Sequence, residues 1–273
     1  MSQIYPKFEC FLFTQKGLQP ITVANHLSAI RRIHYRIGTL TNESANDYVL
    51  NLYKSDYSYS HKANQVRAIE YWFEHLGQRV IFARQQKPRP IIKQTLTEAE
   101  VTRLIFVGRN LREKAIVSLL AYSGLRPKEL RSLRLQDINF GTNEIRVIQG
   151  KGLKDGIIYI SSVCTRILLE YLTNHPRQPE DLMFVTYDGL RPFGQGCLRK
   201  LIKVLTYRAG LAKRVYPYLL RHSLATAMFN RGADILTVKH QLRHSQIETT
   251  EHYIHSLGYC PRNKYELFVP SYI

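Results

Sequence analysis

A basic stretch with two prolines divides this sequence into two segments that each carry their own helical pattern of apolar residues. Residues 84–94 read RQQKPRPIIKQ and show no apolar periodicity. Proline ends regular helix, so Pro88 and Pro90 mark an extended connection. A chain of 273 residues is long enough for two hydrophobic cores. The sequence therefore predicts domains at residues 1–83 and 95–273, joined by a linker at 84–94 that either follows a phosphate backbone or serves only as a tether.

The first segment shows apolar residues at helical spacing. Thr22 is expected to cap a helix that ends before Gly38, and further helices are expected near residues 43–54 and 60–76. This spacing predicts a small, entirely helical domain.

The second segment combines helices with one β-hairpin. Thr97 and Glu100 form a capping-box pattern, and a further helix is expected at 111–123. Two β-rich runs, 144–149 and 156–160, flank a turn with glycines on both sides of Lys151. The expected fold class is mainly α with a small antiparallel β-sheet. The remaining predicted helices lie at 163–174, 194–209, 219–231, 234–242 and 246–256.

The charge balance points to a polyanionic partner. Thirty-nine Lys and Arg against 21 Asp and Glu give a formal net charge of +18. Nucleic acid is the first candidate and an anionic membrane surface the second. No apolar run approaches the roughly 18 residues of a spanning helix, and the first residues lack a signal-peptide pattern. We therefore expect double-stranded DNA as partner, no membrane association, and a cytoplasmic, nucleoid-associated protein.

The cysteines and histidines do not indicate a metal centre. Cys10, Cys164, Cys197 and Cys260 are widely separated, which predicts reduced thiols rather than a zinc site. His240 and His244 have helix-ligand spacing, but no acidic residue completes the set and neighbouring cations disfavour a metal. We expect no metal and no cofactor.

Several candidate residues for phosphodiester chemistry occur in a fixed order. Arg126 follows the run Ser-Gly-Leu, Lys151 lies in the predicted hairpin turn, and Arg221, His244 and Tyr253 occupy the last third of the chain. Arginine binds two phosphoryl oxygens, and lysine can protonate a leaving oxygen. A tyrosine phenol can attack phosphorus once it has lost its proton. By charge alone, Glu129 is expected to partner a nearby arginine.

This order of motifs resembles the tyrosine recombinases of the phage integrase family. The match covers about residues 95–256, and the first helices resemble the core-binding domain of that family. The resemblance implies that Arg126 and Arg221 hold the scissile phosphate, Lys151 is the general acid and His244 supports phosphate and nucleophile. It further implies that Glu129 helps to position the site, and that Tyr253 forms a 3′-phosphotyrosyl bond. Four protomers acting on two duplexes are expected by the same analogy, with a monomer possible off DNA.

The sequence departs from the family pattern at two positions. Tyr218 stands where histidine is usual, as in some integrases of archaeal mobile elements, and a neutral phenol can donate to phosphate but is a poor base. Arg243 stands where glycine is usual, and it either adds a cation near the phosphate or points to solvent.

Three functional hypotheses remain distinguishable at this stage. The leading one is a site-specific recombinase, and the alternatives are a type IB topoisomerase-like enzyme and a DNA-binding accessory protein that has lost catalysis. Relaxation of nonspecific supercoiled DNA would favour the second, whereas the intact set of candidate residues argues against the third. Additional DNA contacts are expected from basic residues off the apolar stripes and in the linker: Arg31, Arg32, Lys62, Arg67, Lys87 and Arg89.

Overall fold

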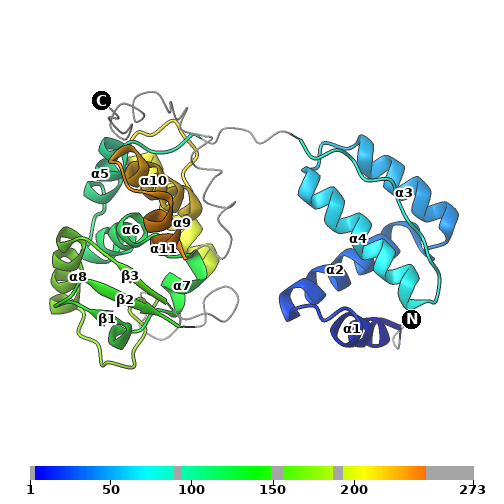
Figure 1. Cartoon of the computed structure of the whole chain (residues 1–273), viewed down its shortest axis with the longest axis horizontal. Coiled ribbons are helices and arrows are strands. Elements are labelled where there is room, and N and C mark those ends of the chain that lie inside the picture. Colours follow the sequence, from blue (N-terminus) through cyan, green and yellow to red (C-terminus); the bar gives the residue numbers. More distant parts are fainter. Residues whose placement is uncertain (1–3, 89–93, 149–155, 187–192, 244–273) are drawn as a thin grey trace, which may run out of the picture. The chain divides into compact units, whose positions relative to one another are not determined.

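The computed structural model describes residues 4–88, 94–148, 156–186 and 193–243 (Figure 1). Contacts divide the chain into two compact units, Met1–Ile91 and Ile92–Ile273. Each unit has its own cluster of buried apolar side chains. Within the described residues, no helix is long and apolar enough to cross a membrane.

The described part of the first unit is a helical bundle (Figure 1). Trp72 belongs to its buried apolar core. The ring of Phe8 meets Trp72 edge-on at a centroid distance of 5.1 Å, and His34 does so at 4.7 Å. Burial lowers the pKa of His34, which favours the neutral ring at this aromatic contact. The helices are α1 (Ile4–Thr14), α2 (Pro20–Ile37), α3 (Asn42–Lys54) and α4 (Tyr59–His75).

Two features of this unit differ from the sequence-based expectation. Helix α1 was not predicted, although Phe8, Phe11 and Leu12 place apolar side chains on one of its faces. The expected cap at Thr22 is wrong, because α2 begins at Pro20. Proline is well suited to the first helical position, where its missing N–H would have no intrahelical partner.

In its described residues, the second unit consists of helices and one small sheet (Figure 1). The sheet is antiparallel with strand order β1-β2-β3, and Ile145 of β2 lies opposite Ile158 of β3. Both isoleucines are buried, so this face of the sheet joins the core. The mainly α fold class with a small antiparallel sheet is therefore confirmed. The elements are α5 (Glu98–Phe106), α6 (Leu111–Ser123), α7 (Pro127–Ser132), the 3-10 turn η1 (Leu135–Asp137), β1 (Ile138–Asn139), β2 (Glu144–Val147), β3 (Gly156–Tyr159), α8 (Ser162–Asn174), α9 (Gln195–Arg208), α10 (Pro217–Asn230) and α11 (Ile235–Leu242).

Helix α6 is the central element of the second unit. It is buried on nearly all sides and packs against α5, α8 and α10. A helix that is covered all round needs few polar positions, which explains why its apolar residues show no single stripe. The predicted capping box is confirmed at the start of α5, where Thr97 Oγ1 accepts from the Glu100 amide and Glu100 Oε2 accepts from the Thr97 amide.

Candidate functional site

The site begins at a tight turn after α6. Gly124 ends the helix with φ 67° and ψ 18°, in the left-handed region that favours glycine. A Cβ at Gly124 would also lie 2.7 Å from Leu242 Cδ2 and 3.1 Å from Leu224 Cδ2. Both the backbone conformation and the close approach of α10 and α11 therefore require glycine at this position.

Arg126 follows this turn and is held by its neighbour Glu129. Arg126 is the residue before the first turn of α7, and Pro127 occupies the first helical position. The Glu129 carboxylate accepts from the Arg126 amide at 2.7 Å and from Arg126 Nη1 at 2.8 Å. Arg126 Nη2 donates to the main-chain oxygen of Arg243 at 3.2 Å. The guanidinium is thus oriented from two sides.

Arg221 reaches the same place from α10 and is almost completely buried. Its guanidinium donates to the main-chain oxygens of Gly124 and Leu242. Leu242 and Arg243 are adjacent, so both arginines are anchored at the end of α11, and Arg221 is also anchored to the turn after α6. Arg126, Glu129 and Arg221 therefore lie around the end of α11, and their roles on phosphate, which the family resemblance implied, stay predictions.

Glu129 stays ionised in this arrangement. Burial by itself would raise the pKa of this carboxyl, but hydrogen bonds from Arg126 and the charge of Arg243 outweigh burial and lower it below the ordinary value of 4.5. An ionised Glu129 can hold the side chains of Arg126 and Arg243 by charge. Its single negative charge faces two guanidinium groups, so the net charge of the three side chains is positive.

Gln241 is a positioning residue that the sequence did not indicate. Its side-chain Nε2 donates to the main-chain oxygens of Ser123 at 3.0 Å and Tyr159 at 2.8 Å. Its Oε1 accepts from the Tyr159 amide at 3.1 Å. One buried amide thus joins α11, strand β3 and the turn after α6. No sequence signal distinguished this glutamine from a surface residue, because its partners are all main-chain atoms.

A groove lies beside the arginines, between α9 and the start of α10. Its volume is about 830 Å³, and Arg199, Lys203 and Arg214 contribute positive charge to its lining. Tyr218 also lines the groove and is half exposed in the first turn of α10. A cationic groove with a phenol at its edge is suited to a polyanionic ligand.

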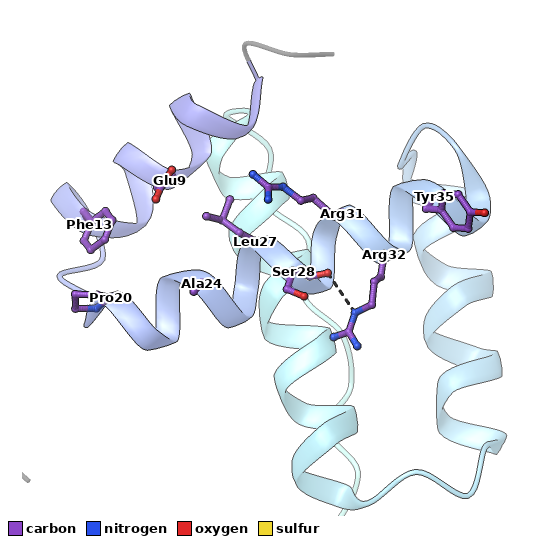
Figure 2. Close-up of a pocket in the computed structure, with 9 residues that line it drawn as sticks. All are labelled: Glu9, Phe13, Pro20, Ala24, Leu27, Ser28, Arg31, Arg32 and Tyr35. Carbon is purple, nitrogen blue, oxygen red and sulfur yellow. Dashed lines mark hydrogen bonds between the residues drawn. The ribbon is translucent and has the colours of Figure 1, made fainter. Parts of the chain in front are cut away.

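The basic residues expected to bind DNA from the first unit occupy different environments. Figure 2 shows Arg31 and Arg32 on α2 at the edge of a pocket of about 510 Å³ between α1 and α2. Both are exposed, although Arg32 Nε donates to the Ser28 main-chain oxygen at 3.2 Å. Lys62, in contrast, donates to the main-chain oxygen of Tyr53 at 2.8 Å. The Nη1 atom of Arg67 lies 3.9 Å from Oε2 of Glu70.

The remaining predicted residues are only partly covered by the structure. Lys87 is exposed in the segment that follows α4. Lys151, His244, Tyr253 and Arg89 lie outside the described residues. Within the described ranges, no group of three or more His, Cys, Asp or Glu side chains could hold a metal ion.

Comparisons with known proteins agree on one family. The model of the phage integrase family matches residues 94–258. A tyrosine recombinase of Pseudothermotoga lettingae is 33% identical over 173 residues, which cover 63% of this chain and 59% of that relative's length. The crystal structure of XerA recombinase aligns over 99% of both chains with 26% identity and a TM-score of 0.58. The XerH site-specific recombinase, in a post-cleavage complex with a palindromic difH substrate, aligns over 91% of this chain and 80% of that chain with a TM-score of 0.70; at 18% identity this likeness concerns the fold alone.

Proposed function

We propose that this chain, which belongs to the phage integrase family, is a site-specific DNA recombinase that cleaves and rejoins DNA through a covalent 3′-phosphotyrosyl intermediate. The observation that carries the proposal is the shared anchoring of Arg126 and Arg221. Arg126 donates to the main-chain oxygen of Arg243, and Arg221 donates to those of Leu242 and Gly124, so both guanidinium groups are fixed at the turn that ends α11. Two preorganised cations at one point are what a phosphoryl group needs as it gains negative charge in the transition state.

In the proposed reaction, the phenol of Tyr253 is the nucleophile. It gives its proton to water or to a phosphate oxygen, its own oxygen bonds to phosphorus, and the bond from phosphorus to the 5′ oxygen breaks. Lys151 gives a proton to the departing 5′ oxygen. The 5′ hydroxyl of another strand then attacks the phosphotyrosine, which releases the tyrosine and completes strand exchange without an external energy source.

The other site residues bind or orient. Arg126 and Arg221 bind the two non-bridging phosphoryl oxygens, and Glu129 orients Arg126. The hydroxyl of Tyr218 donates a hydrogen bond to phosphate, in place of the imidazole that the family usually has. His244 supports the phosphate and the nucleophile.

The DNA surface extends beyond the site. The groove lined by Arg199, Lys203 and Arg214 receives the duplex backbone next to the scissile phosphate. The helical domain at residues 1–83 binds the same duplex through exposed cations such as Arg31 and Arg32, and the linker at 84–94 joins it to the catalytic domain at 95–273. Four protomers on two duplexes form the active assembly, in the cytoplasm and associated with the nucleoid.

A covalent adduct tests this function directly. A binding site is first selected from a pool of random duplexes with the variant Tyr253→Phe, which should bind DNA but lack the nucleophile. A version of this selected duplex with a nick beside the cleavage position traps the adduct, because the short fragment diffuses away before it can be rejoined. Wild-type protein should form an adduct that mass spectrometry maps to Tyr253. An adduct on another tyrosine, or none at all, contradicts the proposal.

The role of Lys151 is tested through the leaving group. Lys151→Ala should cleave the ordinary nicked duplex poorly. When sulfur replaces the 5′ bridging oxygen, the leaving group needs no proton. Cleavage of this duplex by Lys151→Ala should therefore recover. Equal impairment on both substrates would assign Lys151 to phosphate binding instead.

A further inference from the structure

Arg243 occupies a backbone position that favours glycine. It closes α11 with φ 50° and ψ 52°, and its amide donates to the main-chain oxygen of His240 at 2.9 Å. Helices commonly end in this left-handed conformation with glycine, because a Cβ is disfavoured there. An arginine at this position therefore bears a conformational cost that glycine would avoid.

The side chain of Arg243 is turned into the protein. It is only 12% exposed, and its Nη2 lies 2.5 Å from Glu129 Oε2. Its Nε and Nη2 are buried and make no hydrogen bond of standard geometry among the described residues, so the contact between Nη2 and Glu129 is an ion pair. A buried guanidinium is costly unless a carboxylate pairs with it, so Glu129 is the partner that makes this position tenable.

The contacts of Arg243 close a ring through Arg126. Glu129 uses Oε2 for Arg243 and Oε1 for Arg126. Arg126 in turn donates from Nη2 to the main-chain oxygen of Arg243. The guanidinium of Arg126 is therefore fixed by both the backbone and, through Glu129, the side chain of one residue.

Gly156 provides the space for this side chain. A Cβ added at Gly156, the first residue of β3, would lie 2.9 Å from Arg243 Cδ and 3.6 Å from its Cγ. These atoms lie in the middle of the arginine side chain, so a methyl group here would displace the guanidinium. The absence of a side chain at Gly156 thus leaves the space that the Arg243 side chain occupies.

We propose that Arg243 is a positioning residue that fixes the guanidinium of Arg126 through Glu129, and that Gly156 is needed to admit it. The proposal rests on the proposed function, in which Arg126 binds the scissile phosphate. In a chain with glycine at 243, Glu129 would keep its bonds to Arg126 but lose the arginine partner that fixes Oε2 from the side of α11. Arg126 would then lose one side of its support.

A double-mutant cycle tests the pathway through Glu129. Cleavage of the nicked selected duplex is measured in single turnovers for Arg243→Gly, for Glu129→Gln and for the double variant. Each single change should slow cleavage by about 10- to 100-fold, because a small misplacement of a reacting group costs this much. Duplex affinity should change by less than about threefold, since most phosphate contacts remain. The double variant should be no slower than the worse single one. Multiplied effects in the double variant, or an unchanged rate for Arg243→Gly, would overturn the proposal.

A second cycle separates positioning from general disturbance. Gly156→Ala should slow cleavage in the wild-type background but have little effect once residue 243 is glycine, because the methyl group then meets no side chain. Arg243→Lys should restore part of the rate, because it keeps a cation near Glu129. A Gly156→Ala effect of equal size in both backgrounds contradicts the proposed pairing.

One measurement on the protein alone keeps this inference apart from the proposed function. The guanidinium signals of Arg126, assigned by Arg126→Lys in ¹⁵N spectra, should be sharp in the wild type and broadened by faster rotation in Arg243→Gly. If the wild type forms no adduct, the proposed function fails, and these signals still decide whether Arg243 holds Arg126. Identical Arg126 signals in both proteins would show that it does not.

Discussion

The sequence predicts phosphate contacts for Arg31 and Arg32 in the first unit and for Arg126 and Arg221 in the second, and the structure gives the two pairs opposite surroundings. Arg31 and Arg32 are exposed on one helix. Arg126 and Arg221 are tied to main-chain oxygens at two turns, and Arg221 is buried. Exposed cations attract a polyanion over a range of geometries, whereas fixed cations act only on a phosphate held at one place. The difference teaches that charge alone does not separate binding from chemistry.

The largest expected effect is on the fixed arginines. Arg221→Lys keeps the charge but loses the fork that reaches both turns and, in the proposed function, phosphate, so single-turnover cleavage should fall by about 10²- to 10³-fold. Arg31→Lys, the matched change in the first unit, should leave cleavage within about twofold. The comparison breaks if both variants lose activity to the same extent.

The two units also differ in what surrounds their glycines. Gly124 and Gly77 both have positive φ, but a Cβ at Gly77 would meet nothing within 4 Å. Gly77→Ala should lower the free energy of unfolding by about 1–2 kcal/mol, because of the backbone conformation alone. Gly124→Ala should lower it by about 1–3 kcal/mol more, because the methyl group collides with Leu242. Thermal or urea unfolding measures both, and equal losses would mean that the turn after α6 can relax.

Acid stability distinguishes a buried ion pair from an exposed one. The pKa of Glu129 is lowered in the folded state, so its contribution to stability is present above the unfolded pKa and is lost as the pH falls through the folded pKa. Glu129→Gln should therefore cost about 3–5 kcal/mol at pH 7, because two buried guanidinium groups lose their anion. The difference from wild type should shrink as the pH falls below about 4.5.

Glu74→Gln is the matched change in the first unit. Glu74 pairs with Lys16 and its side chain is half exposed, so its removal should cost less than about 1 kcal/mol at any pH. Unfolding of both variants between pH 7 and pH 3 checks this contrast. A pH-independent loss in Glu129→Gln would mean that packing, not charge, holds the arginines.

The smallest effect is expected from the exposed cations. Arg31→Ala combined with Arg32→Ala should weaken duplex binding modestly and reduce the slope of log affinity against log salt by about 2, one for each phosphate contact. Lys62→Gln should change the slope less, because Lys62 is engaged with the Tyr53 main chain. If Lys62→Gln reduced the slope more than the double arginine variant does, the DNA-facing side would be the one that carries Lys62.

The sequence predicted most helices and the hairpin because their signals are local. Thr97 and Glu100 sit at capping-box spacing, and glycines follow the helices that end at Ile37 and Ser123. Helix α1 was missed because it starts with Ile-Tyr-Pro and has no acidic residue in its first turn, although Pro6 is tolerated there. The start of α2 was misplaced because Thr22 and Pro20 are both helix-start signals, and the helix begins at Pro20.

The sequence by itself determined the identity and order of the candidate residues Arg126, Glu129 and Arg221, since those signals are motifs. Only the tertiary structure decided how they are held. The anchors are main-chain oxygens of Gly124, Leu242 and Arg243, and any residue type supplies such an oxygen, so no motif records them. Whether Arg243 meets solvent or Glu129 was likewise open until α7 and α11 were placed together, because a charged side chain shows its partner only when the fold brings one within reach.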